Sequence, residues 1–223
     1  NSKLGAIHMS QNGQMFAELV TIMHEDMAPT LGCTGPISFI YTSAVAREVV
    51  GGNNIKHIKC VANGKFCAGM GEVVTPGLPE DNLEIACAIG AVAGDSSKLY
   101  EVIKDKTPEQ VERAQELSKT SVEVIPDWDA KDLVYVDVSV ETENGVGRCV
   151  VSGTMRNIIL KERNGEVIFK SDYVPGQKKP GVSLRFPNIP SQICILSARR
   201  SPSRNWRSFG SVWMPRKKLV GMA

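Results

Sequence analysis

The first segment with a regular pattern has apolar residues at helical spacing. They recur every fourth position over residues 14–27, at Met15, Leu19, Met23 and Met27, which predicts an amphipathic helix there. A second helix is predicted from Pro36 to Val49. Pro fits the first helical position because it needs no N–H partner, and Gly51 with Gly52 is a stop signal.

Three further helices are predicted before residue 120. The segment 83–93 carries the small residues Ala86, Gly90 and Ala93, which let another backbone approach closely, so we expect this helix to be buried. A helix over residues 98–104 follows. Another begins at Pro108, where Thr107 and Gln110 form a capping box.

The apolar period changes from helical to two residues in the second half. Strands are predicted over residues 134–140 and 146–152, around 158–160, and over 167–169, with one earlier strand at 56–61. Asn144-Gly145 and Asn164-Gly165 separate the later strands in pairs, and Asn-Gly between alternating runs is a strong hairpin signal. Helices followed by a meander predict an α+β fold, with helices packed on a mostly antiparallel sheet.

Residues 63–79 contain six glycines and prolines, which predicts a structured loop with room for one helical turn. Gly69-Met70-Gly71 begins like a dinucleotide-binding loop, but Val74 stands at the third glycine position and no Gly-Lys-Ser/Thr follows. Nucleotide binding is therefore not favoured. A loop that approaches a small substrate, with Asn63 and Lys65 as its polar groups, is the better interpretation.

Charge divides the chain into two parts. The segment 173–223 holds ten Lys or Arg, no Asp or Glu and six of the twelve prolines, whereas the preceding 172 residues hold sixteen basic and twenty-four acidic side chains. The formal net charge of +2 is thus the sum of an acidic body and a basic tail. We expect a flexible lead-in or tag remnant at 1–13, an α+β domain at 14–171 and an irregular basic tail at 172–223.

The tail has three interpretations. It is a basic arm for nucleic acid or an anionic surface, with Trp206 and Trp213 among its arginines; a divergent interaction segment; or the product of a shifted reading frame. The abrupt change in composition favours the third, so nucleic acid is not an expected partner.

Six cysteines occur without any C-x-x-C pair, and no signal-peptide pattern opens the sequence, so a reduced, cytoplasmic setting is expected. No apolar run approaches the roughly 20 residues that a membrane-spanning helix needs.

Cys33 is the most informative candidate for chemistry. It stands in a glycine-containing turn directly before a predicted helix, whose N-terminal amides and dipole favour negative charge. A thiolate there is a nucleophile, base or metal ligand. The alternative is a small buried thiol that only fills space.

Several motifs together resemble the N-terminal half of the iron–sulfur-dependent L-serine dehydratase and L-cysteine desulfidase family. They are Leu-Gly-Cys-Thr-x-Pro-Ile at 31–37, the Gly- and Pro-rich segment through Gly77, Ala-Ile-Gly-Ala-Val-Ala-Gly-Asp at 88–95, Val-Ile-Lys-Asp-Lys-Thr-Pro-Glu at 102–109, Gly-Thr-x-x-Asn-Ile at 153–158 and Asn-Gly-Glu-Val at 164–167. Their order and spacing match over about residues 15–171. The cysteine turn is the most specific of them.

The resemblance implies a lyase. The family removes a β-hydroxyl or β-thiol from a small amino acid, giving aminoacrylate and then pyruvate and ammonia, with a 4Fe-4S cluster iron as Lewis acid and a base at the α-proton. Cys33 matches the family's N-terminal cysteine, which implies a role as cluster ligand or at the active site. Thr34 and Asn157 are the further catalytic candidates that the resemblance implies.

The sequence also departs from the family pattern. Gly35 stands where the family usually has Glu, and Met155 where it usually has His. The second half, with the remaining cluster cysteines, is absent, so we expect this chain neither to hold the cluster nor to be active alone. A separately encoded C-terminal half is the expected partner, and a homo-oligomer is left open. The alternative is a non-catalytic small-molecule-binding or assembly domain on the same scaffold.

Overall fold

The computed structural model describes residues 30–70, 73, 75, 77–78 and 82–177, all within one compact unit that comprises residues 26–179. The lead-in, the helix expected over 14–27 and the tail from residue 178 onward lie outside the described residues. No helix in the described part is both long and apolar enough to cross a membrane.

Six strands form one sheet in the order β2-β1-β3-β4-β5-β6. Their bounds are β1 His57–Asn63, β2 Val122–Asp127, β3 Tyr135–Thr142, β4 Gly145–Ser152, β5 Ile158–Arg163 and β6 Glu166–Lys170. Only the β1–β2 pair is parallel, and every other neighbouring pair is antiparallel. The predicted α+β class with a C-terminal meander is therefore confirmed.

Both Asn-Gly signals mark hairpin turns, as predicted. The β5–β6 turn places Asn164 at φ 53° and Gly165 at φ 83°. Two consecutive residues with positive φ give a turn whose twist matches that of the flanking strands, and Asn and Gly tolerate this backbone best.

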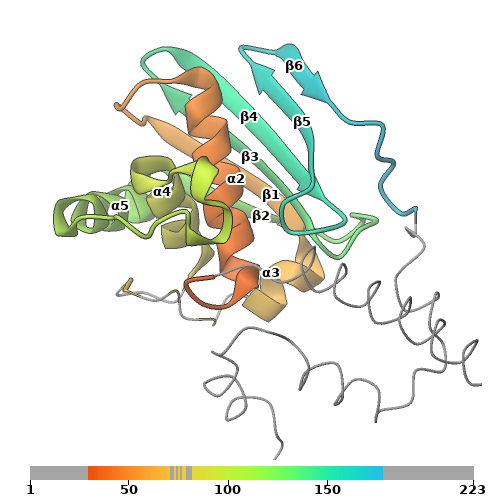
Figure 1. Ribbon diagram of the computed structural model, residues 1–223, viewed down its shortest axis with the longest axis horizontal. Helices are drawn as coiled ribbons and strands as arrows, with labels where there is room; N and C mark the ends of the chain where they lie inside the picture. The colour runs from red at the N-terminus through yellow and green to blue at the C-terminus, as the bar shows by residue number, and fades with distance from the viewer. Residues whose placement is uncertain (1–29, 71–72, 74, 76, 79–81, 178–223) are drawn as a thin grey trace, which may run out of the picture. The chain divides into compact units, whose positions relative to one another are not determined.

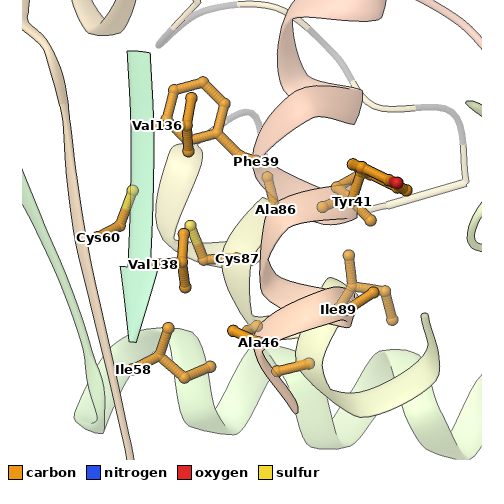
Figure 2. Close-up of a cluster of buried hydrophobic side chains, with 14 of the residues drawn as sticks. Phe39, Tyr41, Ala46, Ile58, Cys60, Ala86, Cys87, Ile89, Val136 and Val138 are labelled. Carbon is orange, nitrogen blue, oxygen red and sulfur yellow. The ribbon is translucent and has the colours of Figure 1, made fainter. Parts of the chain in front are cut away.

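Helices α2 Thr34–Val50, α4 Leu83–Ala93 and α5 Pro108–Thr120 lie on one face of the sheet (Figure 1). Figure 2 shows Cys60 of β1 and Val138 of β3 pointing toward α2 and α4, where they meet Phe39, Ala46 and Cys87. This buried apolar layer between the helices and the sheet is the core.

The predicted close approach at α4 is confirmed. A Cβ added at Gly90 would lie 2.2 Å from the carbonyl oxygen of Ile40 in α2. The two helices therefore pack backbone to backbone at this position, which only glycine permits.

Three elements differ from the sequence-based expectation. A seven-residue helix, α3 Gly64–Met70, lies inside the predicted loop, because Phe66 stacks on Phe39 with ring centroids 5.4 Å apart. A 3₁₀ helix, η1 Ser96–Glu101, with turns after it, replaces the α-helix expected over 98–104. Strand β2 was not predicted.

Candidate functional site at one end of the sheet

The strand register brings several predicted site residues to one end of the sheet. Ala62, next to the last residue of β1, pairs with Val136, and the preceding Tyr135 pairs with Ser152 at the end of β4. Strand β5 begins after the loop that follows Ser152. We call this end of the sheet, where β1 and β4 end and β5 begins, the candidate end. It holds Asn63, Lys65 and Asn157.

Helix α2 also begins at the candidate end. Its C-terminal cap, Gly51, accepts a 2.8 Å hydrogen bond from the Thr142 hydroxyl at the opposite end of β3. Near its first turn, the space beside Gly35 is filled by Met70, the last residue of α3, which directly follows β1. The turn before α2 therefore places Cys33 and Thr34 at the same end of the sheet.

Cys33 is exposed in this turn. The Thr30 hydroxyl donates a 3.0 Å hydrogen bond to the Gly32 carbonyl and shapes the segment before it. Cys33 is the N-cap residue of α2, with extended backbone, and its side chain makes no capping hydrogen bond. The thiol therefore stands free of the helix, beside amides and a dipole that favour an anion.

The other described cysteines are less accessible. Cys60, Cys87 and Cys149 are buried, and burial raises the pKa of Cys149 to about 12. Burial, together with the neighbouring Cys87, raises the pKa of the half-buried Cys67 to about 11. Cys33 is therefore the one exposed thiol within the part of the chain that the structure describes.

The structure gives Asn63 a structural role. Its Nδ2 donates to the carbonyls of Ala130 and Asp132 at 3.1 and 3.0 Å, and its Oδ1 accepts from the amides of Lys65 and Phe66. These four bonds join the end of β1, the start of α3 and the loop before β3. Lys65 itself is exposed on α3. A substrate contact stays a prediction for both residues.

Asn157 lines a cavity of about 390 Å³ at the candidate end. Its Nδ2 donates a 2.8 Å hydrogen bond to the Ser152 carbonyl, which fixes the carboxamide at the cavity wall. Thr154 and Tyr173 also line this space. The cavity is thus built from the segment before β3, the Gly-Thr-x-x-Asn loop and the segment after β6.

The sequence alone did not single out Asp132, which lines the same cavity. Its carboxylate accepts hydrogen bonds from the Ser152 hydroxyl at 2.6 Å, the Tyr173 hydroxyl at 3.0 Å and the Gly176 amide at 2.9 Å. Burial raises the pKa of Asp132, but these three donors outweigh it and hold the pKa below its ordinary value. Asp132 is therefore held as a carboxylate, and its hydrogen bonds fix one wall of the cavity.

Residues 172–177, which the sequence assigned to the tail, take part in this wall. Tyr173 and Gly176 both donate to Asp132. Their backbone is irregular, but it is packed against the α+β domain.

Apolar side chains occupy two positions where the resembling family has ionisable groups. A Cβ added at Gly35 would lie 1.8 Å from the Met70 sulfur, so Met70 fills the space of the missing side chain. Met155 is half-buried and packs against the core. Neither position offers a proton donor or acceptor.

The described residues do not fit a 4Fe-4S cluster by themselves. Such a cluster is normally held by four Cys thiolates. Within the described ranges, no group of three or more His, Cys, Asp or Glu side chains could hold a metal ion. Cys33 offers one exposed thiol, so any further ligands would have to come from elsewhere.

Another cavity, of about 500 Å³, lies at the start of α5. Lys106, Thr107 and Glu112 are among its lining residues, and none of the five predicted site residues lines it. Thr107 is engaged there in the predicted capping box with Gln110.

In a comparison with known proteins, the chain matches part of several longer proteins. It is 32% identical over 188 residues to a UPF0597 protein of Aeromonas hydrophila, a match that covers 80% of this chain and 42% of the relative. The chain is similar to UPF0597 proteins. A Vibrio parahaemolyticus UPF0597 protein is 34% identical over 166 residues, and one from Clostridium botulinum strain Okra is 32% identical over 155 residues.

The chain spans between 35% and 42% of the length of these three UPF0597 relatives. More than half of each relative therefore lies outside the match. No family model and no solved structure matches the chain.

Proposed function

We propose that this chain is the N-terminal part of a lyase that eliminates the β-substituent of L-serine or L-cysteine, and that it requires a second polypeptide for activity. The observation that carries the proposal is the placement of two motifs. The Leu-Gly-Cys-Thr turn and the Gly-Thr-x-x-Asn loop, far apart in sequence, lie at the same end of the sheet. Two motifs of one active site would have to meet in this way.

The reaction removes the α-proton and releases the β-hydroxyl as water or the β-thiol as hydrogen sulfide. The aminoacrylate that remains hydrolyses to pyruvate and ammonia. In this proposal the exposed Lys65 ammonium pairs with the substrate carboxylate, while Asn157 and the Thr34 hydroxyl orient the substrate by hydrogen bonds. Asn63 holds the start of α3 and thereby positions Lys65.

Cys33 is the reactive group that this chain contributes. Its exposed thiol at the start of α2 would supply one of the thiolates that the cluster implied by the resemblance needs. The other ligands belong to the second polypeptide in this proposal. The relatives are long enough for this, since more than half of their length has no counterpart in the match.

The test is anaerobic iron and sulfide reconstitution of the full chain together with the unmatched part of the Aeromonas hydrophila relative. We expect pyruvate from L-serine or L-cysteine with the pair and none with either polypeptide alone. Cys33→Ala should abolish activity and lower the bound iron, whereas Cys67→Ala, the matched control, should retain both. Full activity of Cys33→Ala, or no pyruvate from an iron-loaded pair, would contradict the proposal.

A second candidate function is a non-catalytic small-molecule-binding or assembly domain. The apolar fillings at Gly35 and Met155 favour it, because Met70 and Met155 occupy the space where ionisable groups would act. This alternative predicts that L-serine binds at the candidate end without turnover. Calorimetric binding of L-serine to the reconstituted pair, with no release of pyruvate, would support it over the lyase.

A further inference from the structure

Strand β6 is an apolar strand that no other described segment covers. It is the last strand of the sheet, and all five of its residues are exposed. Val167, Ile168 and Phe169 are exposed to 51%, 54% and 45%. Figure 1 shows the β5–β6 hairpin at the margin of the sheet, on the far side from α4 and α5.

The composition of β6 does not suit a solvent-exposed edge. A strand with one wet face alternates polar and apolar residues, whereas three consecutive apolar residues are typical of a strand covered on both faces. Phe169 pairs with Lys161 and Val167 with Glu162, and the register shifts between these two pairs. Proteins rarely leave such an edge free, because its unpaired amides and carbonyls recruit other strands.

From this exposed strand we infer that β6 is the docking edge for the polypeptide that corresponds to the unmatched part of the UPF0597 relatives, which adds a strand beside β6 and packs on its apolar side chains. The identity of the docking polypeptide rests on the proposed function, whereas the docking edge itself rests on the exposure of β6. More than half of each relative lies outside the match. In the relatives, therefore, a large further segment is available to cover this edge.

The edge also defines the chemistry of the docking strand. Glu166 and Lys170, which carry opposite charges, flank the apolar stretch of β6. The occupant would present an extended apolar segment with a basic residue opposite Glu166 and an acidic residue opposite Lys170. Backbone hydrogen bonds would supply affinity, and the side chains would set the register.

The test uses the full 223-residue chain, tagged and co-expressed with the unmatched part of the Aeromonas hydrophila relative. We expect the two to co-purify and the amides of residues 166–170 to exchange hydrogen more slowly in the complex than in the chain alone. Ile168→Lys should weaken the complex by about tenfold or more, since it places a charge in the apolar contact. The control Leu99→Lys changes an exposed leucine on η1 and should bind normally.

Each remaining outcome overturns the inference. The first is that the relative's segment stays insoluble or does not bind the wild-type chain. The second is that the Ile168→Lys variant binds the segment normally. The third is that the amides protected from exchange in the complex lie only outside β6. If β6 is already protected in the chain alone, light scattering identifies the occupant as a second copy when the chain is dimeric, or as residues 178–223 when it is monomeric. A pyruvate assay on the same complex is read separately, so docking without activity refutes the lyase and not the interface.

Discussion

At the residue scale, the cysteines of the described part differ in what surrounds each sulfur. Cys33 is exposed at a helix start, whereas Cys60, Cys87 and Cys149 are fully buried and Cys67 is half-buried. Because the thiolate is the reactive form, both access and thiolate formation decide how fast a cysteine is alkylated.

Native alkylation with iodoacetamide should therefore modify Cys33 before every other described cysteine. Cys67 should react slowly near neutral pH and faster as the pH rises toward its pKa of about 11. Cys60, Cys87 and Cys149 should react only after unfolding. Peptide mass spectrometry over time measures the order of modification, and modification of Cys149 at the rate of Cys33 would contradict the burial of Cys149.

The hydrogen bonds of Asp132 predict a pH-dependent contribution to stability. Its pKa is lowered in the folded protein, so the stabilisation is present above the unfolded pKa of about 3.9 and is lost as pH falls through the lower folded value. Asp132→Asn should reduce the free energy of unfolding by about 1–2 kcal/mol at neutral pH. The difference from wild type should shrink as the pH approaches about 3.

Urea unfolding across this pH range checks the Asp132 prediction. Asp129→Asn is the matched control, because Asp129 is an exposed aspartate of the same loop. A wild-type advantage that stays constant down to low pH would mean that the charge of Asp132 contributes nothing.

At the element scale, the contact of α2 with α4 depends on a missing side chain. Gly90→Ala should destabilise the protein by about 1–3 kcal/mol, because the added methyl group meets the Ile40 carbonyl and forces the helices apart. Thermal and urea unfolding measure the loss. Gly69→Ala is the control, since nothing lies within 4 Å of a Cβ there. Equal stability of the two variants would contradict the close packing.

Elements defined by local signals were predictable from the sequence. The Asn-Gly hairpins, the Thr107 capping box and the small-residue face of α4 each depend on a few neighbouring residues. Strand β2 depends instead on a distant partner, because Ile58 of β1 pairs with Val122. The sequence indicated only a loop with one helical turn where the seven-residue helix α3 lies, because its glycines suggest a loop, while the Phe66–Phe39 stack that stabilises α3 is a tertiary contact.

The residues of the candidate site also fall into those with a local sequence signal and those that depend on distant partners. Cys33 stood out because its turn and the following helix are local, and Asn157 because of its motif. Asp132 had no local signal, since its donors Ser152 and Tyr173 lie 20 and 41 residues away. The four hydrogen bonds that give Asn63 its structural role were also invisible in the sequence.

At the scale of the whole molecule, the described unit places its candidate chemistry and its uncovered strand in separate places. The candidate end collects the turn before α2, the start of α3 and the loop before β5. Strand β6 forms the lateral edge of the sheet. A second polypeptide could therefore dock along β6 and extend toward the candidate end, which is the arrangement that the proposed function requires.

The most direct measurement of the central claim is an NMR titration of the full chain with L-serine and L-cysteine. We expect amide shifts to change in three separate segments, 31–35, 64–66 and 153–157, because all three belong to one proposed substrate site. D-serine should cause smaller changes at the same positions. Shifts confined to the cavity at the start of α5, or the absence of any change at the candidate end with saturating ligand, would contradict the account.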